Sequence, residues 1–317
     1  RAASVALGRV PCGPARSSSE PPHGCPMKEG VFHTFRLQEG GRGVFYGWFE
    51  AMHSRFDLLL CDVDEPSASA LCRRIADETR RIGGRLNRFD ESSDLRRFDE
   101  GPCGEYLCAD AEMLAFFTDA LRYRRSTEGA FDVCFRTPAC DGATECFRVD
   151  ASCDAVVKLV PQTVFDFGGY AKGYALERAR TAVVSSGVEH ALLSFGNSSV
   201  CAVGTHPSGH PWRVGVENPL RRGESMTTVA LCDAALSSSG NTPRNRGHIR
   251  STVAGRDVTD DRIVSVRGPS PLDCEVLSTA LFAADDRQRT RILDNFPSVR
   301  ATSITFSASG CSVTEYR

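Results

Sequence analysis

The stretch DFGGYAKGYA, residues 166–175, is the part of the sequence that most strongly indicates both a fold and a function. Apolar residues precede it, and Leu176, Ala179 and Val183 follow at helical spacing, which predicts a strand, a glycine turn and a helix. Glycines let a backbone approach a ligand closely, and the N–H groups at a helix start favour an anion. Because Lys172 adds a positive charge, the stretch suits a phosphate with a metal ion; the alternative is a plain turn with one solvated lysine.

The composition is that of an ordinary globular protein, because 41% of the 317 residues are hydrophobic and 25% are charged. This length allows one large domain or two modest ones. The formal net charge of -2 gives no electrostatic footprint for nucleic acid or an anionic membrane, so we expect no nucleic-acid partner. No apolar run approaches the ~20 residues that a membrane-spanning helix needs, so we expect no transmembrane segment.

The first part of the chain differs from the rest in composition. Residues 1–43 contain Pro, Gly, Ser and Arg without hydrophobic periodicity, which predicts a disordered or non-native leader before a functional domain at 44–317. The apolar run at residues 3–7 is too short for a signal-peptide core, and no apolar segment precedes Cys25 as a lipoprotein signal requires. We therefore expect no export signal in the chain as given, and a cytoplasmic location by default.

The chain contains 14 cysteines, which are scattered without a CxxC pair, so zinc-type spacing is absent. Several of them, such as Cys61, Cys201 and Cys232, lie in apolar runs, where a cysteine is usually a small buried hydrophobe. We expect structural thiols. Disulfides are the alternative if the protein is exported, among Cys103, Cys108, Cys134, Cys140, Cys146 and Cys153.

Helical and strand patterns occur in separate blocks along the chain. For example, Leu71, Ile75 and Ile82 share one face of a helix expected at 67–86. Hairpins with separated helices predict an α+β fold with mixed or antiparallel sheets and flanking helices, rather than a doubly wound parallel sheet. The other expected helices are 109–123, 272–284, 287–295 and the one that runs from the glycine stretch to about 185. The expected strands lie within 44–61 and at 191–195, 199–203, 212–216, 227–231, 263–266 and 300–306.

Glu275 and Thr279 are four residues apart in a helical pattern, so a carboxylate and a hydroxyl share one face. Oxygen ligands of this kind suit a hard cation such as Mg²⁺, which keeps water or phosphate oxygens in its other positions. The alternative is an acid that the helix dipole favours, with a threonine bonded back to the carbonyl four residues earlier.

Two further motifs have a functional and a plain interpretation. In the turn at residues 129–132, Phe131 could stack on a nucleotide and Asp132 could accept a hydrogen bond from it, although glycine and aspartate are routine at helix ends. Residues 237–243 are expected to form a small-residue turn. His248, soon after it, has a pKa suited to a proton acceptor near neutrality, although lone histidines are more often ordinary surface or core residues.

Taken in order, these pieces resemble the FAD:protein FMN transferase family, the ApbE-like proteins long described as thiamine-biosynthesis lipoproteins. The resemblance extends from about residue 48 to 306 and implies an ApbE-like flavin transferase fold. Each motif is modest, but the order of all of them matches the family. The matching pieces are residues 52–56, 87–95, 129–132, 166–173, 238–240, 247–249 and 275–279.

The resemblance implies transfer of FMN from FAD to a Thr or Ser hydroxyl of an acceptor protein, with Mg²⁺ required and AMP released. The acceptor would carry a Thr/Ser flavinylation motif and would be a redox protein. By the same resemblance, His248 would activate the acceptor hydroxyl. Mg²⁺ would be held by the Gly169 carbonyl, Glu275 and Thr279, and FAD would be lined by Met52, Phe89, Ala130, Phe131, Asp132, Asp166 and Lys172.

The chain also departs from the family pattern. Glu275 stands where the family usually has Asp, and residues 250–253 replace the Asp-Pro pair that usually follows the His-Ile motif. The change after the His-Ile motif motivates one alternative, a flavin-binding protein without catalysis. A second alternative is an FAD pyrophosphatase, which passes the flavin phosphate to water and yields FMN and AMP, because that reaction needs the same metal and anion site. Family members often work in the periplasm, anchored to the membrane by a lipid.

Overall fold

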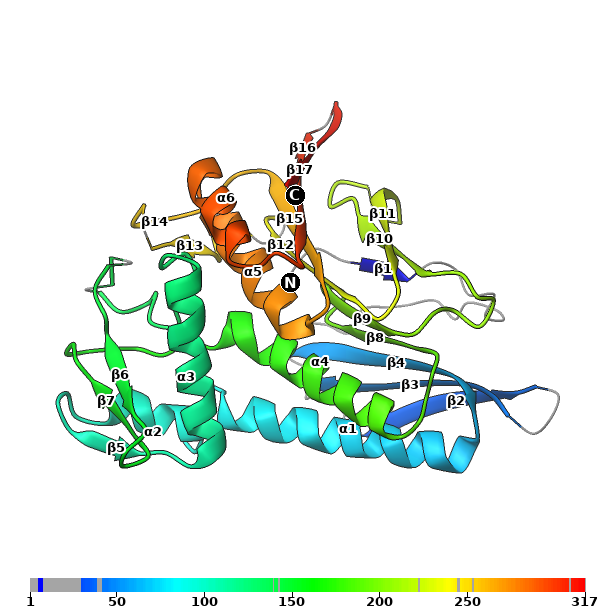
Figure 1. Ribbon diagram of the computed structural model, residues 1–317, viewed down its shortest axis with the longest axis horizontal. Helices are drawn as coiled ribbons and strands as arrows, with labels where there is room; N and C mark the ends of the chain where they lie inside the picture. Colours follow the sequence, from blue (N-terminus) through cyan, green and yellow to red (C-terminus); the bar gives the residue numbers. More distant parts are fainter. Residues whose placement is uncertain are drawn as a thin grey trace.

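The computed structural model describes residues 5–7, 30–38, 42–138, 140–141, 143–221, 223–243, 246–252, 254–307 and 309–316. A large antiparallel sheet lies at its centre, with helices on one face and two smaller sheets beside it (Figure 1). The expected α+β class, with antiparallel sheets and flanking helices, is confirmed.

The central sheet contains nine strands, and each pair of neighbours in it is antiparallel. In β3 the burial alternates, because Phe45, Gly47 and Phe49 face helix α1 whereas Tyr46 and Trp48 face the other side. In spatial order the strands are β17 (Gly310–Tyr316), β16 (Arg300–Ser307), β15 (Arg262–Gly268), β12 (Ala235–Gly240), β9 (Ser199–Val203), β8 (Ala191–Phe195), β4 (Ser54–Val63), β3 (Gly43–Ala51) and β2 (Val31–Leu37).

Three helices cover one face of this sheet: α1 (Glu65–Arg85), α4 (Gly168–Ser185) and α5 (Pro271–Ala283) (Figure 1). Helix α1 begins where the Asp64 side chain accepts a hydrogen bond from the Ser67 N–H, which satisfies one of the free donors of the first turn. Helix α5 is apolar on nearly all sides, so it lies deepest, between α4 and the strands β12 and β15.

The opposite face of the sheet is covered by a small sheet of β1 (Val5–Leu7), β10 (Trp212–Glu217) and β11 (Ser225–Leu231). Trp212, Val214 and Val216 of β10 form a second apolar cluster with Val200 of β9 and Ile263 of β15. The sheet therefore has a core on each face, and the polar site described below lies on the helix-covered face.

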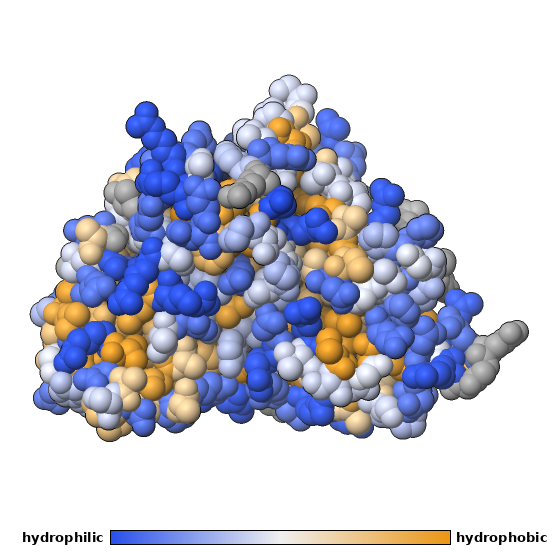
Figure 2. All heavy atoms as spheres, viewed as in Figure 1, coloured by the Kyte–Doolittle hydropathy of each residue, from blue (hydrophilic) through white to orange (hydrophobic). Residues whose placement is uncertain are grey.

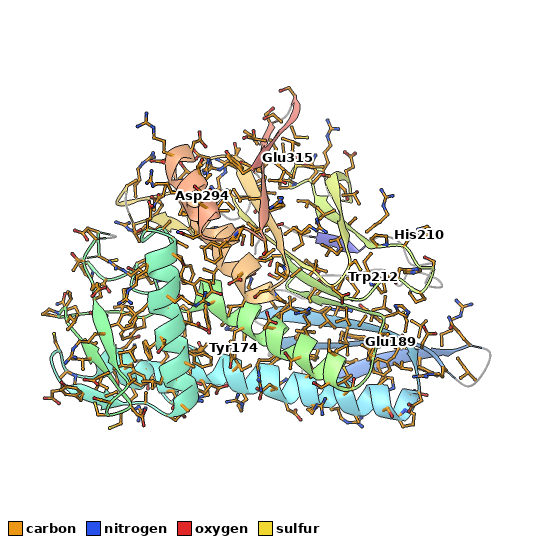
Figure 3. All side chains as sticks on the ribbon, viewed as in Figure 1. Tyr174, Glu189, His210, Trp212, Asp294 and Glu315 are labelled. Atoms are coloured by element: carbon orange, nitrogen blue, oxygen red, sulfur yellow. The ribbon has the colours of Figure 1, made fainter. Side chains whose placement is uncertain are left out.

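At one end of α1 lies a smaller unit in which α3 (Ala111–Ser126) packs on the sheet β5–β7–β6 (Figure 1). Tyr174 of α4 contacts Phe116 of α3 edge to face, so the two units share a buried aromatic contact (Figure 3). The remaining elements are β5 (Tyr106–Cys108), β6 (Phe147–Asp150), β7 (Ala155–Lys158), α2 (Asp94–Glu100), α6 (Asp286–Asp294), β13 (Arg250–Ser251) and β14 (Arg256–Asp257).

Among the described residues, no helix is both long and apolar enough to cross a membrane. In Figure 2, hydrophilic side chains cover most of the visible face, and hydrophilic residues interrupt the apolar patches. The twelve cysteines that the structure describes are all thiols, and five of them are exposed.

The structure corrects three local expectations. No strand precedes the glycine stretch: the N–H groups of Val164 and Phe165 donate to the side chains of Thr137 and Asp99, so no neighbouring strand pairs with them. The expected turn at 237–243 begins inside strand β12.

The third correction concerns residues 1–43, where we expected a disordered or non-native leader. Strand β2 lies in this stretch and pairs with β3 along its whole length, and β1 pairs with β10. The expectation is therefore wrong for Val31–Leu37. This strand is mostly exposed, so its sequence lacks the alternation of apolar and polar residues that marks a half-buried strand. Most of residues 1–29 lie outside the described residues.

The crossing of α4 and α5 gives a first prediction. A Cβ atom on Gly173 would lie 2.6 Å from the Cβ atom of Glu275 and 3.1 Å from the Cα atom of Leu272, so the helices would have to separate. We expect Gly173→Ala to lower the free energy of unfolding by about 2 kcal/mol in urea titrations, because overpacking outweighs the gain in helix propensity.

Gly84 of α1 is the matched control, since a Cβ atom there meets nothing within 4 Å. Gly84→Ala should raise the free energy of unfolding by about 0.5–1 kcal/mol. Equal stabilisation by both substitutions would contradict the close helix crossing.

Candidate functional site

The central feature of the site is an ion pair between Lys172 of α4 and Glu275 of α5. The Lys172 Nζ atom lies 2.5 Å from Oε1 of Glu275, and it also donates to the Ser198 hydroxyl at 3.3 Å. Gly173 makes this possible, because its missing side chain lets the two helices touch. The glycine stretch and the Glu275/Thr279 helix, which are about a hundred residues apart in the sequence, therefore lie against each other.

The carboxylate of Glu275 is almost completely buried, with 4% of the residue exposed. Its second oxygen accepts hydrogen bonds from the hydroxyl of Ser199 on β9 and, at 2.6 Å, from that of Ser237 on β12. Burial alone would raise the pKa of the Glu275 carboxyl, but the Lys172 ammonium and the two hydroxyls outweigh it and hold the pKa below 4.5. Glu275 is thus a carboxylate at neutral pH.

Gly169 and Thr279 meet one helical turn away from the ion pair. A Cβ atom on Gly169 would lie 3.5 Å from the Thr279 Oγ1 atom and 3.2 Å from the Phe131 ring. The Thr279 hydroxyl also lies 3.2 Å from the Ser239 hydroxyl and 3.4 Å from the Glu275 carbonyl oxygen. The three residues predicted to hold the metal are therefore neighbours at the α4–α5 crossing, beside a predicted flavin-lining ring, and the Glu275 carboxylate is directed to Lys172, Ser199 and Ser237.

The donors at this place fit a hard cation. The three residues offer a backbone carbonyl, a hydroxyl and one carboxylate, whose oxygens are paired with Lys172, Ser199 and Ser237 in this structure. Oxygen-only sets of this kind suit Mg²⁺, which retains waters or phosphate oxygens. Among the described residues, no group of three or more His, Cys, Asp or Glu side chains could hold a metal ion.

Asp166 lies at the start of α4. Its carboxylate accepts a hydrogen bond from the Gly168 N–H at 2.9 Å and pairs with Arg136 Nε at 2.6 Å, and Arg88 approaches to 3.8 Å. Next to Arg88, the Phe89 ring is 79% exposed, with the Arg88 guanidinium 4.9 Å from its centre. Phe89 is therefore a solvent-facing ring near Asp166 and not part of the core.

The turn at residues 129–132 is more enclosed than its predicted binding role suggests. Ala130 and Phe131 are each 5% exposed. The Asp132 carboxylate pairs with Arg124 Nε at 2.8 Å and accepts from the Cys134 N–H. In this structure Asp132 thus fixes the turn that presents Phe131 to Gly169, and its carboxylate has protein partners on both oxygens.

Met52 lies in the β3–β4 turn with a positive φ of 48° and packs against Gly83 of α1. The same turn leads into Ser54, which lies against Gly196; a Cβ atom on Gly196 would be 3.9 Å from the Lys172 side chain. The β3–β4 turn is therefore close to the ion pair, as its predicted role in the flavin site requires.

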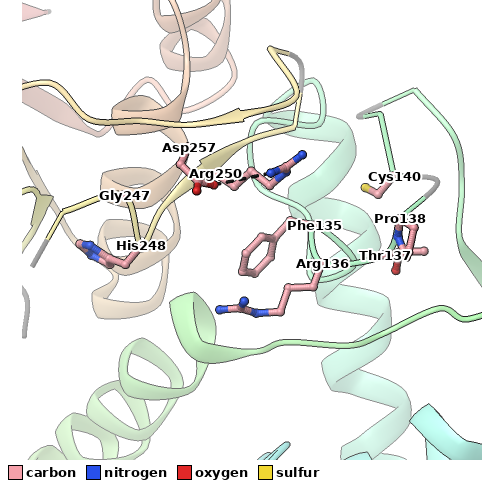
Figure 4. A pocket seen from close by; sticks show the side chains of 9 residues that line it. All are labelled: Phe135, Arg136, Thr137, Pro138, Cys140, Gly247, His248, Arg250 and Asp257. Carbon is pink, nitrogen blue, oxygen red and sulfur yellow. Dashed lines mark ion pairs between the residues drawn. The ribbon is translucent and has the colours of Figure 1, made fainter.

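His248 lines an open pocket of about 440 Å³ between the segment 135–140 and the β13–β14 hairpin (Figure 4). Figure 4 shows the Arg136 guanidinium extending toward His248 beneath the Phe135 ring. Partial desolvation and the nearby Lys172 charge lower the pKa of His248 below 6.5, although part of its ring remains open to solvent. Since Arg136 also pairs with Asp166, the pocket adjoins the start of α4.

The sequence analysis missed the residues that surround Glu275 and the pocket. Ser199 and Ser237 donate hydrogen bonds to the carboxylate. Their only signal in the sequence is that they lie among other small polar residues, a pattern that is more typical of a turn than of a buried site. Arg136 and Arg124 had no local signal, because their acidic partners are brought to them by the fold.

Comparisons with known proteins agree with this geometry. Residues 52–302 match the ApbE family. An FAD:protein FMN transferase of Rhodobacter capsulatus is 32% identical over 139 residues, which are 42% of this chain and 26% of that protein. One of Vibrio cholerae serotype O1 is 22% identical over 240 residues, which are 65% of this chain and 71% of that protein.

Solved structures show the same fold. The apo form of the flavinyl transferase ApbE of Pseudomonas stutzeri superposes with a TM-score of 0.75 at 20% identity, covering 89% of this chain and 97% of that chain. The apbe protein of Thermotoga maritima gives a TM-score of 0.73 at 20% identity, covering 86% and 97%. The expected ApbE-like fold is confirmed.

The buried carboxylate gives a second prediction. Glu275→Gln should lower the free energy of unfolding at pH 7 by about 3 kcal/mol, because Lys172 is left without its buried partner. The folded-state pKa of Glu275 is below 4.5, so its contribution is present above pH 4.5 and lost as the pH falls through the folded value. The difference between wild type and variant should therefore shrink below pH 4.5 in urea titrations.

Glu100→Gln is the control, because Glu100 forms an exposed pair with Arg96 one turn away. It should change the free energy of unfolding by less than about 0.5 kcal/mol. A pH-independent difference for Glu275→Gln would show that the carboxylate is not charged in the folded protein.

Proposed function

Because the chain belongs to the ApbE family, we propose that it transfers the FMN half of FAD to a Thr or Ser hydroxyl of an acceptor protein and releases AMP. The observation that carries this proposal is the meeting of Gly169, Lys172, Glu275 and Thr279 across the α4–α5 crossing. That arrangement combines positive charge with oxygen ligands, which a diphosphate requires before an oxygen nucleophile can approach it.

The proposed reaction needs only the acceptor hydroxyl, FAD and a base to receive the hydroxyl proton. The acceptor oxygen forms a bond to the flavin-side phosphorus of FAD, and the bond from that phosphorus to the bridging oxygen breaks. AMP leaves with the bridging oxygen. The hydroxyl proton passes to the Nδ1 or Nε2 atom of His248, whose lowered pKa keeps the ring neutral at pH 7 and ready to accept it.

Under this proposal, Gly169, Glu275 and Thr279 would hold a Mg²⁺ ion, which would supply charge neutralisation at the diphosphate. Lys172 holds a positive charge at the same place, and part of its side chain is exposed. Phe131 borders Gly169 and excludes water from that side. Asp166 keeps Arg136 beside the pocket of His248.

Hydrolysis of FAD to FMN and AMP is a second candidate, and the exposure of His248 favours it. Its pocket is open to solvent, so water can reach the position that an acceptor hydroxyl would take. The acceptor protein of the transfer reaction would exclude this water by covering the pocket. The acceptor is proposed to be a redox protein with a Thr/Ser flavinylation motif.

Mass spectrometry after incubation with FAD, Mg²⁺ and a candidate acceptor tests the proposal. Gain of one FMN by the acceptor, with AMP released and the reaction stopped by EDTA, is the expected result. Free FMN with AMP and an unmodified acceptor would indicate the hydrolase, and intact FAD that stays bound to the protein would indicate a binder without catalysis.

His248→Ala should lower the transfer rate ~10²–10⁴-fold and leave the dissociation constant of FAD within about twofold, because a base acts on the proton and not on the bound flavin. His210→Ala, which changes an exposed histidine beside β10 and away from α4 and α5, is the matched control (Figure 3). In wild type the rate should rise with pH as His248 loses its proton, with the rise centred below pH 6.5 because the pKa is lowered. Equal losses of rate and FAD affinity would remove the assigned role.

A further inference from the structure

His248 lies in a segment without regular structure, yet its backbone is tied on both sides. The N–H of Gly247 donates to the side-chain oxygen of Asn241 at 3.1 Å. The carbonyl of Ile249 accepts from the N–H of Val258 at 2.9 Å. A base on such a segment needs these ties, because misplacement by about 1 Å can cost about a hundredfold in rate.

Asn241 provides more than one of these ties. It is completely buried directly after β12, and its amide nitrogen donates to the carbonyls of Val258 and Asp260, both at 2.9 Å. Its side-chain oxygen accepts the hydrogen bond from the Gly247 N–H. One side chain thus joins the end of β12, the histidine segment and the segment that enters β15, with both donors and the acceptor satisfied.

The strand that ends at Asn241 also carries the polar partners of the ion pair. Ser237 of β12 donates to Glu275, and Ser239 lies 3.2 Å from the Thr279 hydroxyl. The same short strand therefore sets the position of the Glu275/Thr279 pair and, four residues after Ser237, the position of the histidine segment. Movement of Asn241 would change the distance between these two parts of the site.

We propose that Asn241 is the positioning residue for His248, holding the imidazole in register with the Lys172–Glu275 ion pair. The proposal rests on the proposed function, because it assigns a purpose to the placement of His248. Asn241 itself reaches neither the pocket nor the proposed flavin site and acts only through the backbone of Gly247 and the carbonyls beside β15.

The charge environment of His248 supplies a readout of its position. Within the described residues, the charged groups around its pocket are Arg136, Arg250 and Asp257 on the pocket walls, and Lys172 beyond them. Each of these cations has an acidic partner: Arg250 pairs with Asp257 at 3.6 Å, Arg136 with Asp166 and Lys172 with Glu275. Desolvation and Lys172 lower the pKa of His248, and both effects depend on where the segment holds the ring.

The experiment is an NMR titration of His248 together with steady-state kinetics, in full-length wild type and Asn241→Ala. We expect the pKa of His248 to rise toward 6.5 in the variant, kcat to fall about 10- to 100-fold, and KM for FAD to change less than about twofold. Asn241→Gln keeps the acceptor and both donors on a side chain that is one methylene longer and adds no charge near His248, so it should give a smaller change in both quantities.

Asn295→Ala is the matched control, because the Asn295 amide also donates to a backbone carbonyl, that of Ser126 at 2.9 Å, between α3 and α6. It should leave the pKa of His248 and kcat unchanged. If Asn241→Ala does not fold, the Asn241→Gln titration decides in its place. An unchanged pKa of His248 in a folded Asn241 variant overturns the inference, and so does an equal effect of Asn295→Ala.

This titration needs no flavin chemistry, so it separates the inference from the proposed function. A wild-type protein that transfers no FMN would refute the function, whereas the pKa comparison would still show whether Asn241 places His248.

Discussion

A carboxylate buried between two helices and a sheet is the constraint on which the structure of the site depends. An isolated charge in such a place would cost several kcal/mol, so Glu275 needs partners with good geometry. It obtains them from Lys172 on α4, Ser199 on β9 and Ser237 on β12. Three elements are thus tied to one side chain of α5, and Gly173 supplies the space that lets α4 come close enough.

The same constraint prepares the site for a charged ligand. The ion pair places a lysine and a carboxylate near Gly169 and the Thr279 hydroxyl, beside the buried Phe131 ring. Electrostatic interactions are stronger there than in bulk solvent. A diphosphate with its cation would compete with Lys172 for Glu275, so the ion pair that stabilises the protein without ligand also keeps the site charged and organised for it.

Much of this could be predicted from local patterns. The apolar stripe of α1 and the short apolar strands β8 and β9 are set by neighbouring residues, so the bounds expected for them lie close to the observed ones. The spacing of Glu275 and Thr279 places both on one face of α5, and the structure agrees that they flank the glycine stretch.

What could not be predicted depends on contacts between distant segments. Residues 164 and 165 look like a strand, but their N–H groups bond to side chains from α2 and the segment after α3. Asp132 looks like a ligand-binding acid, but the fold brings Arg124 to it. The serines of β12 are typical of a turn, but the segment pairs with β15 and β9 and its hydroxyls bond to α5 and β15, which local propensity does not record.

The central claim of the proposed function is that Gly169, Glu275 and Thr279 bind a divalent ion beside Lys172 and the diphosphate of FAD. A crystal structure with FAD and Mn²⁺ in place of Mg²⁺, located by anomalous scattering, tests it most directly. The account predicts one manganese peak within about 2.5 Å of the Gly169 carbonyl oxygen, a Glu275 carboxylate oxygen and the Thr279 hydroxyl oxygen, with the diphosphate next to Lys172. A peak elsewhere, or FAD bound away from the α4–α5 crossing, would contradict it.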